Sequence, residues 1–104
     1  MGLFSSLWGA KPQLPENAVL LDVRTPAEYA SGAIEGAKSV PLDQLVSKIH
    51  SVLPDKNISI IVYCRSGARS SQAVALMSQL GYTQLFNGGG VGTLALQLQK
   101  KVVS

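Results

Sequence analysis

The chain is 104 residues long, 46% hydrophobic and 14% charged, and it carries a formal charge of +3. This length is typical of one domain with a single packed core, and the composition is that of a globular protein. The basic residues are dispersed, which argues against a nucleic-acid-binding arm, and no apolar run is long enough to span a bilayer.

The chain contains a single cysteine, Cys64, which excludes an intrachain disulfide. No cluster of cysteine and histidine residues has the spacing of metal ligands, so we expect no bound metal. A modest positive charge without a basic block favours a small anionic ligand over a polyanion.

The start of the chain differs in character from the rest. We expect residues 1–17 to form a short apolar segment with a proline-containing linker, and residues 18–104 to form the folded domain. The apolar side chains from Leu3 to Trp8 would share one face of a short helix. We favour packing of that face on the domain over contact with a membrane or a partner. The segment lacks the basic start and the long apolar core of a secretory signal.

The apolar run at residues 18–21 predicts a fully buried strand. The sequence Thr25-Pro26-Ala27-Glu28 follows, with threonine as N-cap, proline at the first helical position and glutamate at the third. This pattern is a capping box, which marks a helix start, and we expect the short helix to end near Gly32.

Residues 34–40 predict a weak strand, and Pro41 opens the next predicted helix. Apolar residues recur in that helix at the spacing of one buried face: Leu42, Leu45, Val46, Ile49 and Leu53. The sequence Pro54-Asp55-Lys56-Asn57 ends it. The only histidine, His50, lies off this face, so we expect it to be a solvated surface residue.

The most informative stretch covers residues 58–81. A nearly continuous apolar run ends at Cys64, a short polar loop follows, and a helix is then predicted up to Gly81. The apolar residues at helical spacing are Ala73, Leu76, Met77 and Leu80. Such a loop can direct its backbone N–H groups and the positive end of the helix dipole at one point beyond the strand.

The C-terminal part predicts a short strand at residues 83–86, a glycine-rich turn at residues 87–90 and a helix from Val91 to Val102. Leu94, Leu98 and Val102 lie on one stripe of that helix. Short strands that alternate with helices indicate an α/β sandwich with a mostly parallel sheet. Ligands bind such sheets beyond the carboxyl ends of the strands, which is where Cys64 falls.

Cys64 is the candidate nucleophile. A free cysteine has a pKa of about 8.5, so only a small fraction is thiolate at neutral pH. Helix N-termini, converging amides and nearby guanidinium groups favour the anion. The residues that offer such groups, or let the backbone curl around the sulfur, are Arg65, Ser66, Gly67, Arg69, Ser70 and Ser71. This crowding of donors disfavours the alternative of a buried cysteine that only packs.

Two other cysteine chemistries fit this loop less well. A cysteine protease or acyltransferase needs a histidine base, and His50 is predicted to be elsewhere on the surface. Cysteine phosphatases use a related loop that is one residue longer between cysteine and arginine, and Ser70 stands where they need that arginine. The shorter loop predicts a smaller cradle, which suits a single sulfur atom better than a tetrahedral phosphate.

Four motifs occur in order along the chain. They are Leu21-Asp22-Val23-Arg24 with Glu28-Tyr29, Gly32-Ala33-Ile34-Glu35-Gly36-Ala37 leading to Val40-Pro41, Cys64-Arg65-Ser66-Gly67-Ala68-Arg69, and Leu80-Gly81-Tyr82 followed by Asn87-Gly88-Gly89-Gly90. Together they resemble the single-domain rhodaneses, a thiosulfate sulfurtransferase-like family, from about Ala18 to Leu98. The resemblance implies a rhodanese-like three-layer sandwich, with a mostly parallel central sheet flanked by helices on both faces.

The resemblance also implies a role for each matching residue. Cys64 would attack the outer sulfur of thiosulfate, release sulfite and pass the resulting persulfide sulfur to cyanide or a thiol. The substrate-binding cradle would consist of Arg65, Ser66, Gly67, Ala68 and Arg69. Asp22 and Arg24 would support the loop, although we favour a purely structural pair.

Two positions depart from the family pattern. Ala33 stands where the family commonly has histidine, and Leu94 falls where an aromatic residue is common. Both positions usually serve packing, so the expected activity is unchanged.

These features predict a cytoplasmic sulfurtransferase without a metal or other cofactor, since a lone cysteine stays reduced most easily in the cytosol. The expected partners are a small anionic sulfur donor such as thiosulfate, a thiol or cyanide acceptor, and a sulfur-relay protein. Nucleic acid and an integral membrane span are not expected. Two alternatives stay open: a sulfur-carrier or binding module without turnover, and a cysteine phosphatase or arsenate reductase variant of the same fold.

Overall fold

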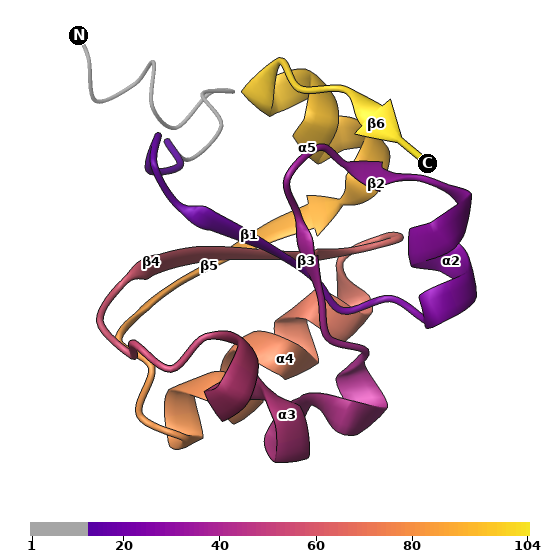
Figure 1. The fold of residues 1–104 in the computed structure, drawn as a ribbon. Coiled ribbons are helices and arrows are strands. Elements are labelled where there is room, and N and C mark those ends of the chain that lie inside the picture. The colour runs from indigo at the N-terminus through magenta and orange to yellow at the C-terminus, as the bar shows by residue number, and fades with distance from the viewer. Residues whose placement is uncertain (1–12) are drawn as a thin grey trace, which may run out of the picture.

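A four-stranded parallel sheet forms the centre of the domain (Figure 1). The structure is a computed structural model that describes residues 13–104, so the predicted packing of Leu3 to Trp8 lies outside the described residues. The elements in chain order are β1 (Val19–Asp22), α2 (Pro26–Ser31), β2 (Ala33–Ile34), β3 (Lys38–Ser39), the 3-10 helix η1 (Leu42–Gln44), α3 (Leu45–Val52), β4 (Ser59–Cys64), α4 (Ala68–Gln79), β5 (Gln84–Gly90), α5 (Val91–Leu98) and β6 (Val102–Val103).

The strand order β3-β1-β4-β5 places β4 inside the sheet, between β1 and β5. Val62 of β4 is in register with Leu21 of β1 on one side and with Asn87 of β5 on the other. A parallel strand that is covered on both faces needs apolar residues throughout, which explains the nearly continuous apolar run before Cys64. The cysteine therefore ends an inner strand, at the carboxyl edge of the sheet.

Each face of the sheet has its own hydrophobic core. On one face, α3 and α4 pack on β4 through residues such as Ile49, Met77 and Val62. On the other face, α5 contributes Leu94 and Ala95, with α2 at its margin (Figure 1). The prediction of a three-layer sandwich with helices on both faces is confirmed. Among residues 13–104, no helix combines the length and apolar character that crossing a membrane requires.

The capping box that was predicted for the first helix is present at the start of α2. Glu28 N–H donates to Thr25 Oγ1 at 3.2 Å, and Thr25 N–H donates to Glu28 Oε1 at 3.0 Å. Gly32 follows the last helical residue, as predicted, and its N–H donates to the Tyr29 carbonyl. The local sequence thus sets both ends of this short helix.

The strand predicted at residues 34–40 is instead two separate two-residue strands. β2 pairs antiparallel with β6 in a small second sheet, whereas β3 joins the main sheet beside β1. Gly36, with φ +85, lies between them and redirects the chain, because its positive φ is readily adopted only by glycine.

The helix predicted from Pro41 begins with the 3-10 turn η1, and regular α-helix starts only at Leu45. A 3-10 turn winds more tightly than an α-helix, so it rotates the buried face of the residues that follow. Val46, which was predicted to face the core, is 55% exposed, because the buried stripe of α3 is limited to Leu45 and Ile49. Leu45 and Ile49 are fully buried, as predicted.

The C-terminal predictions need two corrections. Residues 87–90 are not a turn, because β5 continues to Gly90 and stays paired with Cys64 across an irregularity in register. The last helix ends at Leu98 and not at Val102, because Gln99 adopts a left-handed conformation with φ +55. Val102 instead pairs with Ile34 in the second sheet.

Candidate active site

The Cys64 loop, defined here as residues 64–70, connects the end of β4 to the first turn of α4. Gly67 has φ +104 and directly precedes the first residue of α4. This left-handed conformation turns the chain tightly, so the amides at the start of α4 face back towards the cysteine side chain. A Cβ atom on Gly90 would lie 2.6 Å from the Arg65 carbonyl oxygen, which shows how closely β5 approaches the loop.

Hydrogen-bond donors meet at the Cys64 sulfur. Gly67 N–H donates to Sγ at 2.9 Å, and Ser70 Oγ lies 3.5 Å from Sγ. The backbone amides of Ser66 and Ser70 also stabilise the anion. The hydroxyl-bearing side chains of Ser66 and Ser71 are exposed, whereas Ser70 is buried. The loop therefore places one amide and one hydroxyl at hydrogen-bonding distance from the sulfur.

Burial and hydrogen bonding act on Cys64 in opposite directions. Its side chain is only 1% exposed, and this burial is the largest single influence, raising the pKa of the thiol. The hydrogen bonds from the Ser70 hydroxyl and from the amides of Ser70, Gly67 and Ser66 lower that pKa. Their combined effect is the larger one, so the pKa of Cys64 lies below the ordinary value for cysteine.

Asn87 of β5 completes a polar cluster around Ser70. Ser70 Oγ lies 2.7 Å from Asn87 Oδ1 and 3.0 Å from the Gly67 carbonyl oxygen. Asn87 Oδ1 also accepts the Gly89 N–H at 2.9 Å, and Asn87 Nδ2 donates to the Gly67 carbonyl at 3.4 Å. Sequence reasoning missed Asn87 as a site residue because it was assigned to a turn. The available signal was a polar residue just before a run of glycines.

The two arginines of the predicted cradle differ in their surroundings. Arg65 is exposed. Arg69 forms two hydrogen bonds with the Glu28 carboxylate, Nη1 to Oε1 at 2.7 Å and Nη2 to Oε2 at 3.0 Å. The hydrogen bonds from Arg69 lower the pKa of Glu28 to about 2, with a further contribution from the Thr25 amide. Arg69 thus joins α4 to α2, and Arg65 is the arginine of the loop that is open to an anion.

Asp22 and Arg24 form a buried pair. Arg24 Nη2 lies 2.6 Å from Asp22 Oδ2, and the Arg24 backbone N–H donates to Asp22 Oδ1 at 2.9 Å. Arg24 Nη2 also donates to the Gly32 carbonyl at 2.6 Å. The hydrogen bond with Asp22 raises the pKa of Arg24 further. These contacts join the segments on either side of α2, in agreement with a structural pair.

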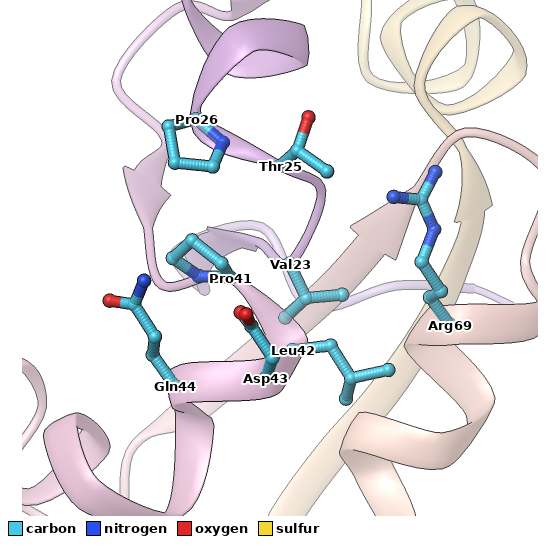
Figure 2. A pocket seen from close by; sticks show the side chains of 8 residues that line it. All are labelled: Val23, Thr25, Pro26, Pro41, Leu42, Asp43, Gln44 and Arg69. Atoms are coloured by element: carbon cyan, nitrogen blue, oxygen red, sulfur yellow. The ribbon is translucent and has the colours of Figure 1, made fainter.

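A pocket of about 340 Å³ opens beside the Cys64 loop. Figure 2 shows Arg69 on one side, Pro41 and Gln44 on the other, and Thr25 above them in this view. Its remaining lining residues are Val23, Pro26, Leu42 and Asp43. Arg69 belongs to both the loop and the pocket, so the pocket adjoins the predicted cradle and can accommodate part of a substrate larger than a single sulfur.

Within residues 13–104, no group of three or more His, Cys, Asp and Glu side chains is arranged to hold a metal ion. His50 is exposed on α3, as predicted, with its ring centroid 6.2 Å from that of Tyr82. The polar contacts of Cys64 come from its own loop, and His50 is not among them.

The chain is similar to rhodanese-like domains and to proteins named sulfurtransferases. The family model of the rhodanese-like domain matches residues 8–91. Thiosulfate sulfurtransferase PspE of Escherichia coli (strain K12) is 38% identical over 76 residues, which are 73% of this chain and 73% of that protein. A sulfurtransferase of Allochromatium vinosum is 40% identical over 77 residues, covering 73% of this chain and 70% of the relative.

Solved structures share the fold. A structure described as a rhodanese with anions from E. coli superposes with a TM-score of 0.70 at 37% identity, covering 73% of this chain and 89% of the other. The rhodanese-like domain of the Alr3790 protein from Anabaena sp. gives a TM-score of 0.73 at 28% identity, covering 99% of this chain and 92% of the other.

Proposed function

Because this chain belongs to the rhodanese-like family, we propose that it is a sulfurtransferase that carries sulfur as a persulfide on Cys64. The observation that carries the proposal is the hydrogen bond from Gly67 N–H to Sγ, supported by the amides of Ser66 and Ser70. Donors held at this point stabilise negative charge on sulfur both before and after loading. Two relatives at 38% and 40% identity that are named sulfurtransferases support the same reaction class.

In the first half-reaction, the Cys64 thiolate attacks the outer sulfur of thiosulfate. A bond forms between Sγ and that sulfur, the bond to the sulfite sulfur breaks, and sulfite leaves with the bonding electron pair. Cys64 is then a persulfide anion, so the total charge is conserved. The exposed Arg65 attracts the dianionic donor, and the loop amides bind the charge on the outer sulfur.

In the second half-reaction, a thiophilic acceptor takes the outer sulfur. Cyanide attacks that sulfur, the bond to Sγ breaks, and Cys64 returns to the thiolate while thiocyanate leaves. A thiolate acceptor reacts in the same way and leaves as a persulfide. Both steps regenerate the anion that the loop stabilises, so no external proton or redox partner is needed.

One observation favours a second candidate function, that of a sulfur carrier. Cys64 is only 1% exposed, so access of a small donor to the sulfur would require the loop to open. Slow opening would permit loading and storage of one sulfur without rapid turnover. A carrier of this kind receives its sulfur from, or delivers it to, a relay protein.

The test is a thiosulfate:cyanide assay on the wild type, on Cys64→Ala and on Ser78→Ala, an exposed α4 control. Sulfur transfer predicts thiocyanate formation by the wild type and the control but not by Cys64→Ala. Equal rates in all three would refute the proposal. Intact mass after thiosulfate treatment separates the two functions, since one added sulfur without cyanide turnover supports the carrier.

A small anionic sulfur donor, thiosulfate in the assay, and a thiol or cyanide acceptor follow from the reaction. We propose a cytoplasmic location because Cys64 is an unpaired, buried cysteine whose reaction requires the reduced form.

A further inference from the structure

Ser70 carries one hydroxyl proton but faces three possible acceptors. Asn87 Oδ1 lies 2.7 Å away, the Gly67 carbonyl 3.0 Å and the Cys64 sulfur 3.5 Å. A single O–H group can donate to only one of them in full strength. Where that proton points therefore depends on the charge state of the sulfur.

The orientation of the Asn87 amide is fixed by its neighbours. Gly89 N–H donates to Oδ1 at 2.9 Å, so an amide flip would place two donors against each other. The flip would also lose the contact from Nδ2 to the Gly67 carbonyl at 3.4 Å. Asn87 therefore presents an acceptor, and not a donor, to the Ser70 hydroxyl.

Two arrangements of the Ser70 proton follow. When Cys64 is a neutral thiol, its S–H donates to Ser70 Oγ while Ser70 O–H donates to Asn87 Oδ1. When Cys64 is a thiolate, it is an acceptor only, and the Ser70 proton turns towards it. Ser70 Oγ and Asn87 Oδ1 then face each other at 2.7 Å without a proton between them. Their repulsion offsets part of the stabilisation that the thiolate gains from the Ser70 hydroxyl.

We propose that Asn87 is a positioning residue that holds the Ser70 hydroxyl proton while Cys64 is a thiol or a persulfide, and yields it to Sγ when the thiolate forms. In the persulfide the charge lies mainly on the outer sulfur, so Sγ is a weak acceptor and the Ser70 proton returns to Asn87. The persulfide part of this inference rests on the proposed function, but the thiol part does not.

The consequence for the reaction is a thiolate that is not stabilised too far. The nucleophilicity of a thiolate falls as its pKa falls, and the best attacking thiol has a pKa near the ambient pH. By competing for the Ser70 proton, Asn87 opposes the acidifying effect of the loop amides. It thereby keeps the emptied Cys64 reactive towards the next donor.

The charged groups around the loop stay the same in the variants proposed below. They are Arg65 in the loop, Arg69 of α4 paired with Glu28 of α2, and the Asp22–Arg24 pair at the end of β1. The elements β5 and α5 contain no charged residue. A shift in Cys64 titration can therefore be assigned to the Ser70 proton.

The test measures the pH dependence of Cys64 alkylation in Asn87→Leu, Ser70→Ala and the double variant. Asn87→Leu removes the competing acceptor, so the midpoint falls by about 0.5 to 1 unit, the equivalent of one neutral hydrogen bond. Ser70→Ala removes the donor, so the midpoint rises. In the double variant the midpoint equals that of Ser70→Ala, because Asn87 acts only through Ser70.

One further variant keeps the test decisive. Asn57→Leu is the control, since Asn57 contacts Thr83 at the amino end of β5 and its substitution leaves the midpoint unchanged. A merely structural role for Asn87 predicts a looser loop and a higher midpoint in Asn87→Leu. A higher or unchanged midpoint in Asn87→Leu would overturn the proposal. The same downward shift when Asn87→Leu is added to Ser70→Ala would overturn it too.

Alkylation needs no sulfur donor, so this test stands whether or not sulfur is transferred. If the variants show the predicted midpoint shifts but the protein has no sulfurtransferase activity, only the proposed function is refuted. Normal activity without the predicted shifts would refute the role of Asn87 alone.

Discussion

The guanidinium of Arg69 and the carboxylate of Glu28 meet in two parallel hydrogen bonds of 2.7 and 3.0 Å. Glu28 Oε1 also accepts the Thr25 N–H that starts α2. One carboxylate therefore serves the capping box and the contact between α2 and α4. This geometry ties the helix start that the sequence predicts to the loop that carries Cys64.

Glu28→Gln tests this contact through stability. The depressed pKa of Glu28, about 2, means that the ion pair stabilises the fold above the unfolded-state pKa of about 4.3. That contribution is lost as the pH falls towards 2. We expect Glu28→Gln to lower the free energy of unfolding by about 0.2–1 kcal/mol at pH 7, because both side chains are partly exposed.

Urea unfolding at pH 7 and at pH 3 measures the difference. The gap between wild type and Glu28→Gln shrinks at the lower pH, whereas the exposed-residue control Glu16→Gln shows little gap at either pH. A gap that is constant with pH would mean that the carboxylate charge contributes nothing.

Gly90→Ala tests the close approach of β5 to the Cys64 loop. The added Cβ would lie 2.6 Å from the Arg65 carbonyl oxygen, which is a backbone atom, so the loop must move. A displacement of this kind lowers the rate of sulfur transfer by about 10- to 100-fold. The matched control is Gly92→Ala in α5, where a Cβ meets no atom within 4 Å.

The two alanine variants differ in stability as well as in activity. Gly92→Ala keeps wild-type activity and gains at most about 0.5–1 kcal/mol, the preference for alanine over glycine inside a helix, because Gly92 lies in the first turn of α5. Thermal unfolding and the thiocyanate assay give both readouts. Full activity in Gly90→Ala would show that the loop tolerates displacement.

Gly67→Ala separates backbone strain from loss of the sulfur contact. Gly67 and Gly36 have φ values of +104 and +85, which cost an alanine about 1–2 kcal/mol. We expect both Gly67→Ala and Gly36→Ala to lose stability by this amount in urea unfolding. Only Gly67→Ala disturbs the amide that donates to Cys64 Sγ, so only it raises the alkylation midpoint. Equal midpoints in the two variants would contradict this role of the Gly67 amide.

Much of the architecture follows from patterns in the chain. The apolar run before Cys64 predicts an inner strand because a parallel strand buried on both faces excludes polar side chains. The capping box predicts the start of α2, and it is found there, because its two hydrogen bonds are local.

Features that depend on distant contacts were not predictable. The sequence Asn87-Gly88-Gly89-Gly90 has the composition of a turn, yet its pairing with β4 keeps it extended. Gly88 is needed because a Cβ there would lie 2.7 Å from Ile61 and 2.8 Å from Leu94. Tertiary packing of this kind overrides local preference, and it is also what brings Asn87 to the site.

The site itself was predicted in outline. The loop sequence indicates amides directed at Cys64, and the structure places the Gly67 N–H against the sulfur. The loop sequence does not reveal that Glu28 forms an ion pair with Arg69, because the two residues are far apart in the chain. Nor does the sequence reveal how deeply Cys64 is buried. Burial raises the pKa of its thiol, whereas the hydrogen bonds lower it.

The central claim is that the loop donors outweigh burial and lower the pKa of the Cys64 thiol. The pH dependence of the alkylation rate of the wild-type protein tests it most directly, with the Cys64→Ala variant as the blank. The account predicts a midpoint below the ordinary cysteine pKa of about 8.5. The alkylation rate rises as the pH passes through the midpoint and levels off above it. A midpoint at or above the ordinary cysteine pKa would mean that burial prevails, and it would contradict the account.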